Sequence, residues 1–194
     1  MKQTVVTALA ALALTTAPAL AQTSTKTSHG KSSAAAKSES TADHAFAREA
    51  AIGGMAEVEL GNLAKQKASS ADVKAFGDRM VTDHSKANDE LKQWAASKSV
   101  TLPAEPDAKA KATEDRLSKL SGDAFDKAYM KDMVADHQKD VAAFKKESTS
   151  GKDADLKAWA GKTLPTLEDH LKMADDTASK VGAASRKTAK PKSK

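Results

Sequence analysis

Three histidines of this sequence occur in copies of one short pattern, an Asp-His pair followed one residue later by a lysine. The copies are Asp83-His84-Ser85-Lys86, Asp136-His137-Gln138-Lys139 and Asp169-His170-Leu171-Lys172. A neutral imidazole is a common ligand of transition metals, and it often donates its second ring N–H to a carboxylate. The pattern therefore predicts either a metal site or a set of buried histidines tied to acidic side chains.

The first two copies resemble each other beyond the tetrapeptide. Each is preceded by a Met-Val pair, Met80-Val81 or Met133-Val134, and by an aromatic residue eight positions before the histidine, Phe76 or Tyr129. Similarity at a fixed offset, here 53 residues, is the mark of an internal repeat. It predicts a duplicated helical hairpin.

Apolar residues recur at helical spacing in four long blocks, and no segment alternates as a strand would. The predicted helices are 42–68, 71–98, 123–148 and 153–181. Short turns at 69–70 and around Gly151 make each successive pair an antiparallel hairpin. The connection 99–122, with a short polar helix near 107–120, can cross the full height of a bundle. The predicted fold is all-α, a ferritin-like four-helix bundle of two hairpins with a long crossover that contains a short helix.

On helical wheels, His84, His137 and His170 all fall within the apolar stripes of their helices. Each lies near the middle of its helix, so the three imidazoles should meet at one level of the bundle. The first helix carries Glu57 and Glu59 at the same level, one on each side of its apolar stripe. The pattern does not decide which of the two faces the histidines.

Three imidazoles and one carboxylate match the ligand count of a mononuclear four-coordinate site. The candidate ligands are His84, His137, His170, Glu59 and Glu57. Adjacent helical residues do not face each other, so Asp83 should accept a hydrogen bond from a histidine of another helix. Nearby thioethers favour copper, and zinc is the other candidate. The predicted outer partners are Asp83, Asp136, Asp169, Asn88, Asp140, Met80 and Met133.

A purely structural role is the alternative interpretation of the same residues. Buried histidines paired to Asp or Asn fill many protein cores, and methionine is a general gap-filler there. Under that interpretation the histidine layer binds no metal. The remaining histidines, His29 and His44, lie outside the layer.

The two ends of the chain differ from the middle. Residues 1–21 have a positive start, an apolar run and the small-residue motif Ala19-Leu20-Ala21, which predict a signal peptide and export to the periplasm or cell envelope. Residues 22–41 are predicted to form a disordered linker and 182–194 a disordered basic tail, which leaves 42–181 as the folded domain. The chain has no cysteine, so disulfides and thiolate metal ligands are excluded.

All of the net positive charge lies outside the predicted domain, and the formal charge of the whole chain is +5. Lys2 contributes +1, the linker +2 and the tail +5, which leaves −3 for residues 42–181. A net acidic domain with 4% aromatic residues offers no surface for nucleic acid. The tail is a candidate contact for anionic lipid or an envelope polymer. No spanning helix is expected in the mature chain.

Several motifs resemble the bacterial domain-of-unknown-function 4142 family. They are Gly53-Gly54-Met55-Ala56-Glu57-Val58-Glu59-Leu60-Gly61, Val73-Lys74-Ala75-Phe76, Met80-Val81-Thr82-Asp83-His84, Asn88-Asp89-Glu90-Leu91 and Leu164-Pro165-Thr166-Leu167-Glu168-Asp169-His170-Leu171. Members are usually labelled predicted outer membrane proteins and regarded as ferritin-like. The resemblance covers about residues 42–181 and implies a helical bundle in the cell envelope.

No catalytic signature accompanies these motifs. Di-iron carboxylate proteins carry Glu-x-x-His on two helices, whereas Val81, Val134 and Leu167 stand three residues before the three histidines. The sequence therefore favours a non-enzymatic envelope accessory or stress-related protein. The alternative is a copper or zinc chaperone or sequestration protein that uses the histidine layer.

Overall fold

The computed structural model describes residues 30–183, with side chains from residue 41 onward. This part of the chain forms five α-helices and no β-strand. The helices are α1 (Gly30–Lys67), α2 (Ala71–Ser97), α3 (Ala108–Ser118), α4 (Gly122–Ser150) and α5 (Ala154–Lys180). The predicted all-α class is confirmed. None of the helices in these residues is long and apolar enough to cross a membrane.

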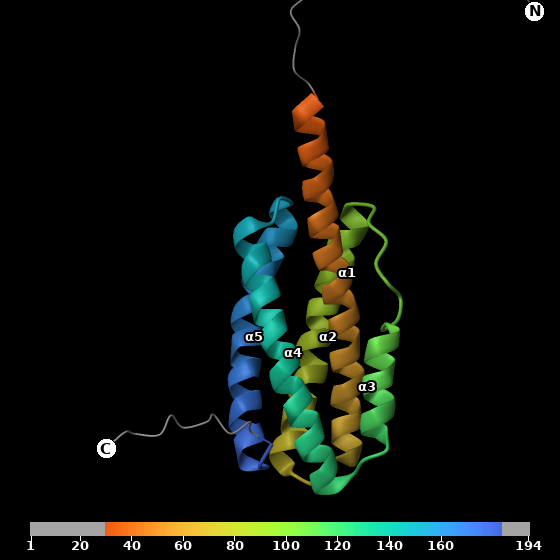
Figure 1. The fold of residues 1–194 in the computed structure, drawn as a ribbon, viewed down its shortest axis with the longest axis vertical. Coiled ribbons are helices and arrows are strands. Elements are labelled where there is room, and N and C mark those ends of the chain that lie inside the picture. Colours follow the sequence, from red (N-terminus) through yellow and green to blue (C-terminus); the bar gives the residue numbers. More distant parts are fainter. Residues whose placement is uncertain (1–29, 184–194) are drawn as a thin grey trace, which may run out of the picture.

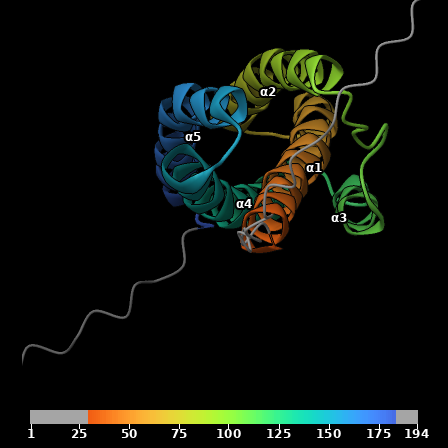
Figure 2. The same cartoon turned by 90° about the horizontal axis from the view of Figure 1, so that it is seen from above.

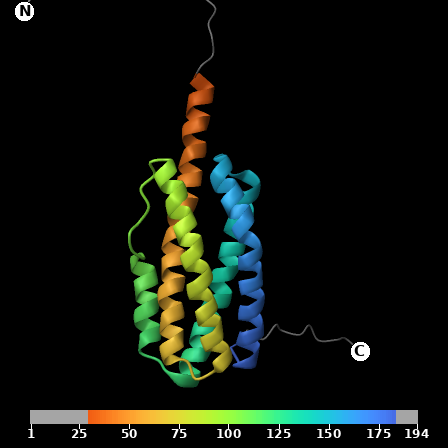
Figure 3. The same cartoon turned by 180° about the vertical axis from the view of Figure 1, so that it is seen from behind.

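The four longer helices stand side by side around a common axis, and the shorter α3 lies outside them against α1 (Figure 1). Viewed from above, α1, α2, α5 and α4 follow one another around the axis (Figure 2). The closest pairs are α1 with α2 and α4 with α5, which are the two predicted hairpins, and α2 also packs on α5 and α1 on α4. The segment between α2 and α4 returns along the outside of the bundle and includes α3 (Figure 3).

Helix α1 begins at Gly30, well before the predicted start at residue 42. Residues 30–41, predicted to belong to a disordered linker, are therefore helical, and α1 extends beyond the ends of its neighbours (Figure 1). Alanine and lysine, which make up five of the twelve residues in 30–41, have a high helix propensity that favours this extension. The predicted signal peptide, residues 22–29 of the linker and residues 184–194 of the tail lie outside the described residues.

The apolar core consists of two clusters at opposite ends of the bundle, and the three histidines lie between them. On α2, Met80 belongs to the first cluster and Leu91 to the second, with His84 between the two. The same order holds on α4, where His137 lies between Met133 and Phe144. The histidine layer is thus enclosed by apolar packing above and below.

Two glycines bring α1 and α2 into close contact below the histidine layer. A Cβ atom at Gly77 would lie 2.8 Å from the carbonyl oxygen of Gly61, and one at Gly61 would lie 2.7 Å from the carbonyl oxygen of Gly77. The absence of side chains at both positions lets the two backbones approach.

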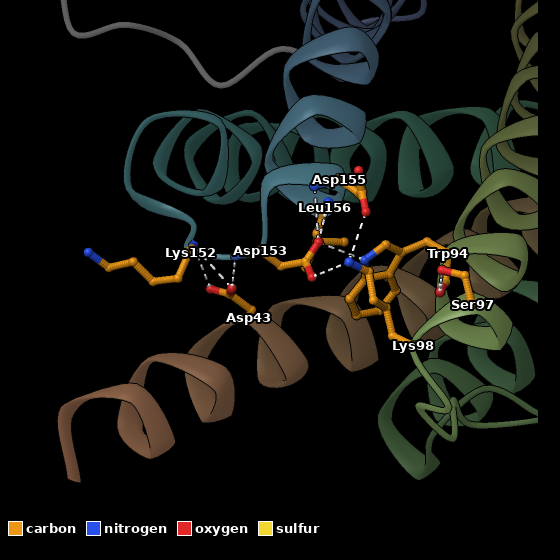
Figure 4. Close-up of polar contacts among 8 residues, drawn as sticks. All are labelled: Asp43, Trp94, Ser97, Lys98, Lys152, Asp153, Asp155 and Leu156. Carbon is orange, nitrogen blue, oxygen red and sulfur yellow. Dashed lines mark hydrogen bonds and ion pairs between the residues drawn. The ribbon is translucent and has the colours of Figure 1, made fainter. Parts of the chain in front are cut away.

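Both interhelical turns of the hairpins are held by an aspartate from the opposite hairpin. Asp126 on α4 accepts hydrogen bonds from the backbone N–H groups of Ser69 (3.2 Å) and Ser70 (2.8 Å). Asp43 on α1 accepts equivalent bonds from Lys152 (3.0 Å) and Asp153 (2.6 Å), as Figure 4 shows. Each aspartate is buried and satisfies donors that would otherwise be unpaired at a turn.

These paired contacts relate the two hairpins by an offset of 83 residues, which separates Asp43 from Asp126 and Ser69 from Lys152. The offset of 53 between the first two histidine motifs is different, because it aligns α2, the second helix of one hairpin, with α4, the first helix of the other. The predicted repeat of a hairpin at an offset of 53 is therefore wrong. The equivalent positions are 83 residues apart.

Beyond the turn, Asp153 joins α5 to α2. Its carboxylate caps α5 by accepting the backbone N–H groups of Asp155 and Leu156. It also accepts the indole N–H of Trp94 (3.0 Å) and pairs with Lys98 (2.9 Å), both near the C-terminal end of α2 (Figure 4). One side chain thus starts a helix and connects the two hairpins at this end of the bundle.

Candidate metal centre

The predicted convergence of three imidazoles is found in the structure. His84 on α2, His137 on α4 and His170 on α5 are buried, and one ring nitrogen of each lies within 4.8 Å of those of the other two. Their ring centroids are 5.3 to 5.8 Å apart. Among the described side chains, these three residues form the cluster whose spacing fits a metal ion.

Hydrogen bonding determines which ring nitrogen of His137 keeps a lone pair that could bind a metal ion. Its Nδ1 lies 2.9 Å from the backbone carbonyl oxygen of Met133, which can only accept a hydrogen bond. The proton of the neutral ring is therefore on Nδ1. Nε2 retains its lone pair, is buried and has no hydrogen-bond partner within the protein.

His170 is oriented by the carboxylate of Asp83. Its Nε2 lies 2.9 Å from Oδ2 of Asp83, to which it donates, and its Nδ1 is buried without a partner. The structure contains the predicted hydrogen bond in which Asp83 accepts from a histidine of another helix. Asp83 is itself held by Arg79, one turn earlier on α2.

Burial keeps all three rings neutral at physiological pH. Burial, together with the neighbouring imidazoles, lowers the pKa of His84 to about 3 and that of His137 to about 4. Burial also lowers the pKa of His170, although its bond to Asp83 acts in the opposite direction. Because a protonated imidazole cannot ligate a metal, these rings are ready to bind one without first losing a proton.

The two predicted glutamates of α1 have different environments. Glu59 is exposed, so its prediction as a ligand of the buried layer is wrong. Glu57 is buried with an exposed fraction of 4%, and its Oε1 lies 4.0 Å from Nδ1 of His137. That is the nitrogen bonded to Met133, on the other side of the ring from the free Nε2. Glu57 therefore lies behind His137 and is not part of the cluster of ligand atoms.

The residues predicted to support the histidines from outside the cluster also lie in different environments. Asp169 is exposed, and Asp136 forms an ion pair with Lys139 (2.9 Å). Among the described residues no hydrogen bond joins Asn88 to His84 or Asp140 to His137, although Asn88, Asp140 and His84 line one small cavity. Met80 and Met133 are fully buried in the apolar core. Sequence reasoning considered the Met133 thioether but missed its carbonyl, which carries the contact with His137.

The small cavity has a volume of about 20 Å³ and adjoins His84. Polar side chains of Asn88, Asp140 and Thr163 contribute to its walls. A space of this size with several polar partners can hold one water molecule. A three-histidine centre leaves a fourth coordination position, which a water molecule can occupy.

An all-helical bundle with a buried cluster of three neutral imidazoles defines the class of this protein. Residues 26–177 match the family described as "Domain of unknown function (DUF4142)", and the chain belongs to that family. The comparison with curated proteins found no match. A crystal structure of a DUF305 protein from Streptomyces coelicolor, described as secreted, is similar with a TM-score of 0.63 and 17% sequence identity. The alignment covers 73% of this chain and 93% of the other, and at this identity the likeness concerns the fold alone.

Proposed function

We propose that this protein binds one zinc or copper ion through His84, His137 and His170 and sequesters it or carries it in the cell envelope. The observation that carries the proposal is the set of three buried ring nitrogens without partners, Nε2 of His84, Nε2 of His137 and Nδ1 of His170. Leaving several buried polar atoms unpaired is costly unless something else satisfies them. A single metal ion would satisfy all three at once.

The hydrogen bonds on the far side of two rings support the proposal. Metal-bound histidines usually donate their second N–H to a carboxylate or a backbone carbonyl, which fixes the tautomer and aims the free nitrogen. His170 has a carboxylate partner in Asp83, and His137 has a carbonyl partner in Met133. A purely structural cluster gives no reason for a ring nitrogen of each histidine to lie within 4.8 Å of those of the other two.

The ligand set restricts the metal. Imidazole nitrogens suit zinc and copper, and the buried site contains no thiolate. Bonds of about 2.0–2.1 Å bring tetrahedral ligand nitrogens to roughly 3.4 Å from one another. The separations of up to 4.8 Å are wider, so binding would draw the three rings together by about 1 Å through side-chain rotation.

The proposal also includes export from the cytoplasm and a ferritin-like fold class. The expected signal peptide and the description of the structurally similar Streptomyces protein as secreted both support a location outside the cytoplasm. The arrangement of α1, α2, α5 and α4 with a long crossover supports the ferritin-like four-helix class. The missing Glu-x-x-His motifs favour binding and transport of one ion over di-iron oxidation.

Titration of the metal-free mature chain, without an affinity tag, tests the proposal. Zn²⁺, Cu²⁺ and ascorbate-reduced copper would each be added to the wild type and to His84→Gln, His137→Gln and His170→Gln. The matched control is His44→Gln, because His44 is exposed and lies outside the layer. One equivalent should bind to the wild type and the control and raise their thermal stability, and each layer variant should lose at least 100-fold in affinity. Absence of a metal-dependent rise in Tm in the wild type would refute the proposal.

A further inference from the structure

A second cavity lies between α1, α3 and α4, and none of the three histidines lines it. This groove has a volume of about 350 Å³, which is in the range of small-molecule sites. Its apolar wall includes Phe46, Ile52, Leu60 and Phe144. The groove exists because α3 packs against α1 from outside the ring of longer helices (Figure 2).

Two carboxylates line this groove from equivalent positions of the two hairpins. Glu57 on α1 and Asp140 on α4 are 83 residues apart, the same offset that relates Asp43 to Asp126. Glu57 is 4% exposed, and its Oε2 is buried without a hydrogen-bond partner. A buried carboxylate in such surroundings is stabilised by an added positive charge.

The cations already present leave Glu57 without a partner. The groove is also lined by Glu49, Asp107, Asp136 and two lysines, Lys109 and Lys139. Lys139 is exposed and pairs with Asp136 at 2.9 Å, and Lys109 is exposed on α3. Asp107 caps α3 by accepting the backbone N–H of Ala110. The carboxylate that is both buried and unpaired is Glu57, with Asp140 beside it.

We propose that the groove binds a small organic ammonium ion, whose charged end pairs with Glu57 and Asp140 and whose apolar body lies against Phe46, Ile52 and Leu60. The apolar wall distinguishes this ligand from a metal ion, which would require several convergent oxygens. The carboxylates of the groove form no such cluster, since the described side chains that meet the spacing of a metal site are the three histidines. The proposal does not depend on metal binding by those histidines.

Gly53 offers a direct way to block the groove. It lines the cavity from α1, and a Cβ atom added there would meet no heavy atom within 4 Å. We expect a leucine side chain at this position to occupy part of the groove. Gly53→Ala is the matched control, because its single methyl group leaves most of the groove open.

The test measures binding of phenethylammonium to the metal-free full mature chain by calorimetry and ligand-observed NMR in the presence of EDTA. The neutral comparison ligand is 2-phenylethanol, which has the same body and no charge. We expect one equivalent of phenethylammonium to bind the wild type and Gly53→Ala at least tenfold more tightly than the alcohol does. Gly53→Leu and the double variant Glu57→Gln/Asp140→Asn should each lose at least tenfold in affinity.

Several results would overturn this proposal. They are equal affinity for the two ligands, undiminished binding in Gly53→Leu, and the absence of binding to a wild type that is folded by circular dichroism. The variant His170→Gln separates this site from the histidine layer, because it removes a candidate metal ligand and leaves the groove lining unchanged. It should bind phenethylammonium like the wild type, and a loss of binding there would contradict an independent site.

Discussion

The Nε2 atom of His170 on α5 lies 2.9 Å from Oδ2 of Asp83 on α2, and this hydrogen bond joins the two hairpins beside the three-histidine cluster. Arg79 holds the same carboxylate from the solvent side. Partial burial alone would raise the pKa of Asp83, but the bonds from Arg79 and His170 lower it below its usual value. The carboxylate is therefore charged at neutral pH and fixes the orientation of the imidazole.

Replacing Asp83 by Asn should weaken metal binding without removing a ligand. The amide can no longer stabilise the N–H of His170 as a charge does, and losses of about 10- to 100-fold are usual for such outer partners. Competition titration with a chromogenic chelator measures the change. Asp169→Asn is the control, since Asp169 is exposed and should have no effect. Equal affinities in the two variants would argue against a coupling between Asp83 and the site.

The burial of His84 predicts a pH dependence of stability in the metal-free protein. Its pKa is about 3 in the folded state because of burial and the two neighbouring imidazoles. In the unfolded chain its pKa is about 6.5. Between about pH 3 and pH 6.5 the imidazole is therefore protonated in the unfolded state and neutral in the folded state. The stability that His84 contributes is complete above pH 6.5 and decreases as the pH falls toward 3. The variant His84→Gln lacks this pH-dependent contribution to stability.

Urea unfolding of the wild type and His84→Gln at pH 7.5 and 5.0 checks this expectation. The difference in free energy of unfolding between the two proteins should shift by about 2 kcal/mol against the wild type at the lower pH. EDTA must be present at both pH values so that no bound metal contributes. A difference that is independent of pH would mean that folding leaves the pKa of His84 unchanged, which would contradict this expectation.

Asp140 should have the opposite pH dependence. Burial and the nearby Asp136 raise its pKa to about 7, against about 3.8 in the unfolded chain. Its ionisation therefore destabilises the folded state above pH 7, and this penalty disappears as the pH falls toward 3.8. Asp140→Asn should stabilise the metal-free protein by roughly 1 to 3 kcal/mol at pH 8 and have little effect at pH 4. Thermal unfolding at the two pH values measures the effect, and destabilisation at pH 8 would contradict it.

Two glycines in helices should respond to alanine in opposite directions. At Gly53 the added methyl group enters open space, so the higher helix propensity of alanine should stabilise the protein by about 0.5–1 kcal/mol. At Gly77 it would meet the carbonyl oxygen of Gly61 at 2.8 Å and the Cβ of Ala64 at 2.9 Å. Forcing α1 and α2 apart should cost about 1–3 kcal/mol. Denaturant unfolding of both variants measures the change in free energy of unfolding, which should be positive for Gly53→Ala and negative for Gly77→Ala.

The aspartates that hold the turns should have similar importance. Asp43→Ala and Asp126→Ala each leave two backbone N–H groups at a turn without their acceptor, which should cost about 2–4 kcal/mol. Exposed Asp89 on α2 provides a control, for which alanine should change the stability by less than about 0.5 kcal/mol. Differential scanning calorimetry measures all three variants. A large effect at only one of the two turns would contradict the equivalence of the hairpins.

The sequence by itself determined which helices form and which way their histidines face. Helical periodicity is a local property, so the bounds of α2, α4 and α5 lie within about two residues of their predictions. It also placed His84, His137 and His170 in apolar stripes at mid-helix. The role of Asp83 followed from the same geometry, because adjacent residues on a helix cannot face each other.

Only the tertiary structure decided what surrounds those histidines. Glu57 and Glu59 flank the same stripe, and the rotation of α1 against its neighbours buries Glu57 and exposes Glu59. The contact of His137 with the backbone carbonyl of Met133 could not be predicted from the sequence, since every residue has a backbone carbonyl. The true offset between the hairpins was also hidden, because it appears in contacts such as those of Asp43 and Asp126 and not in similar motifs. Such properties depend on the packing of whole helices, which a local pattern does not record.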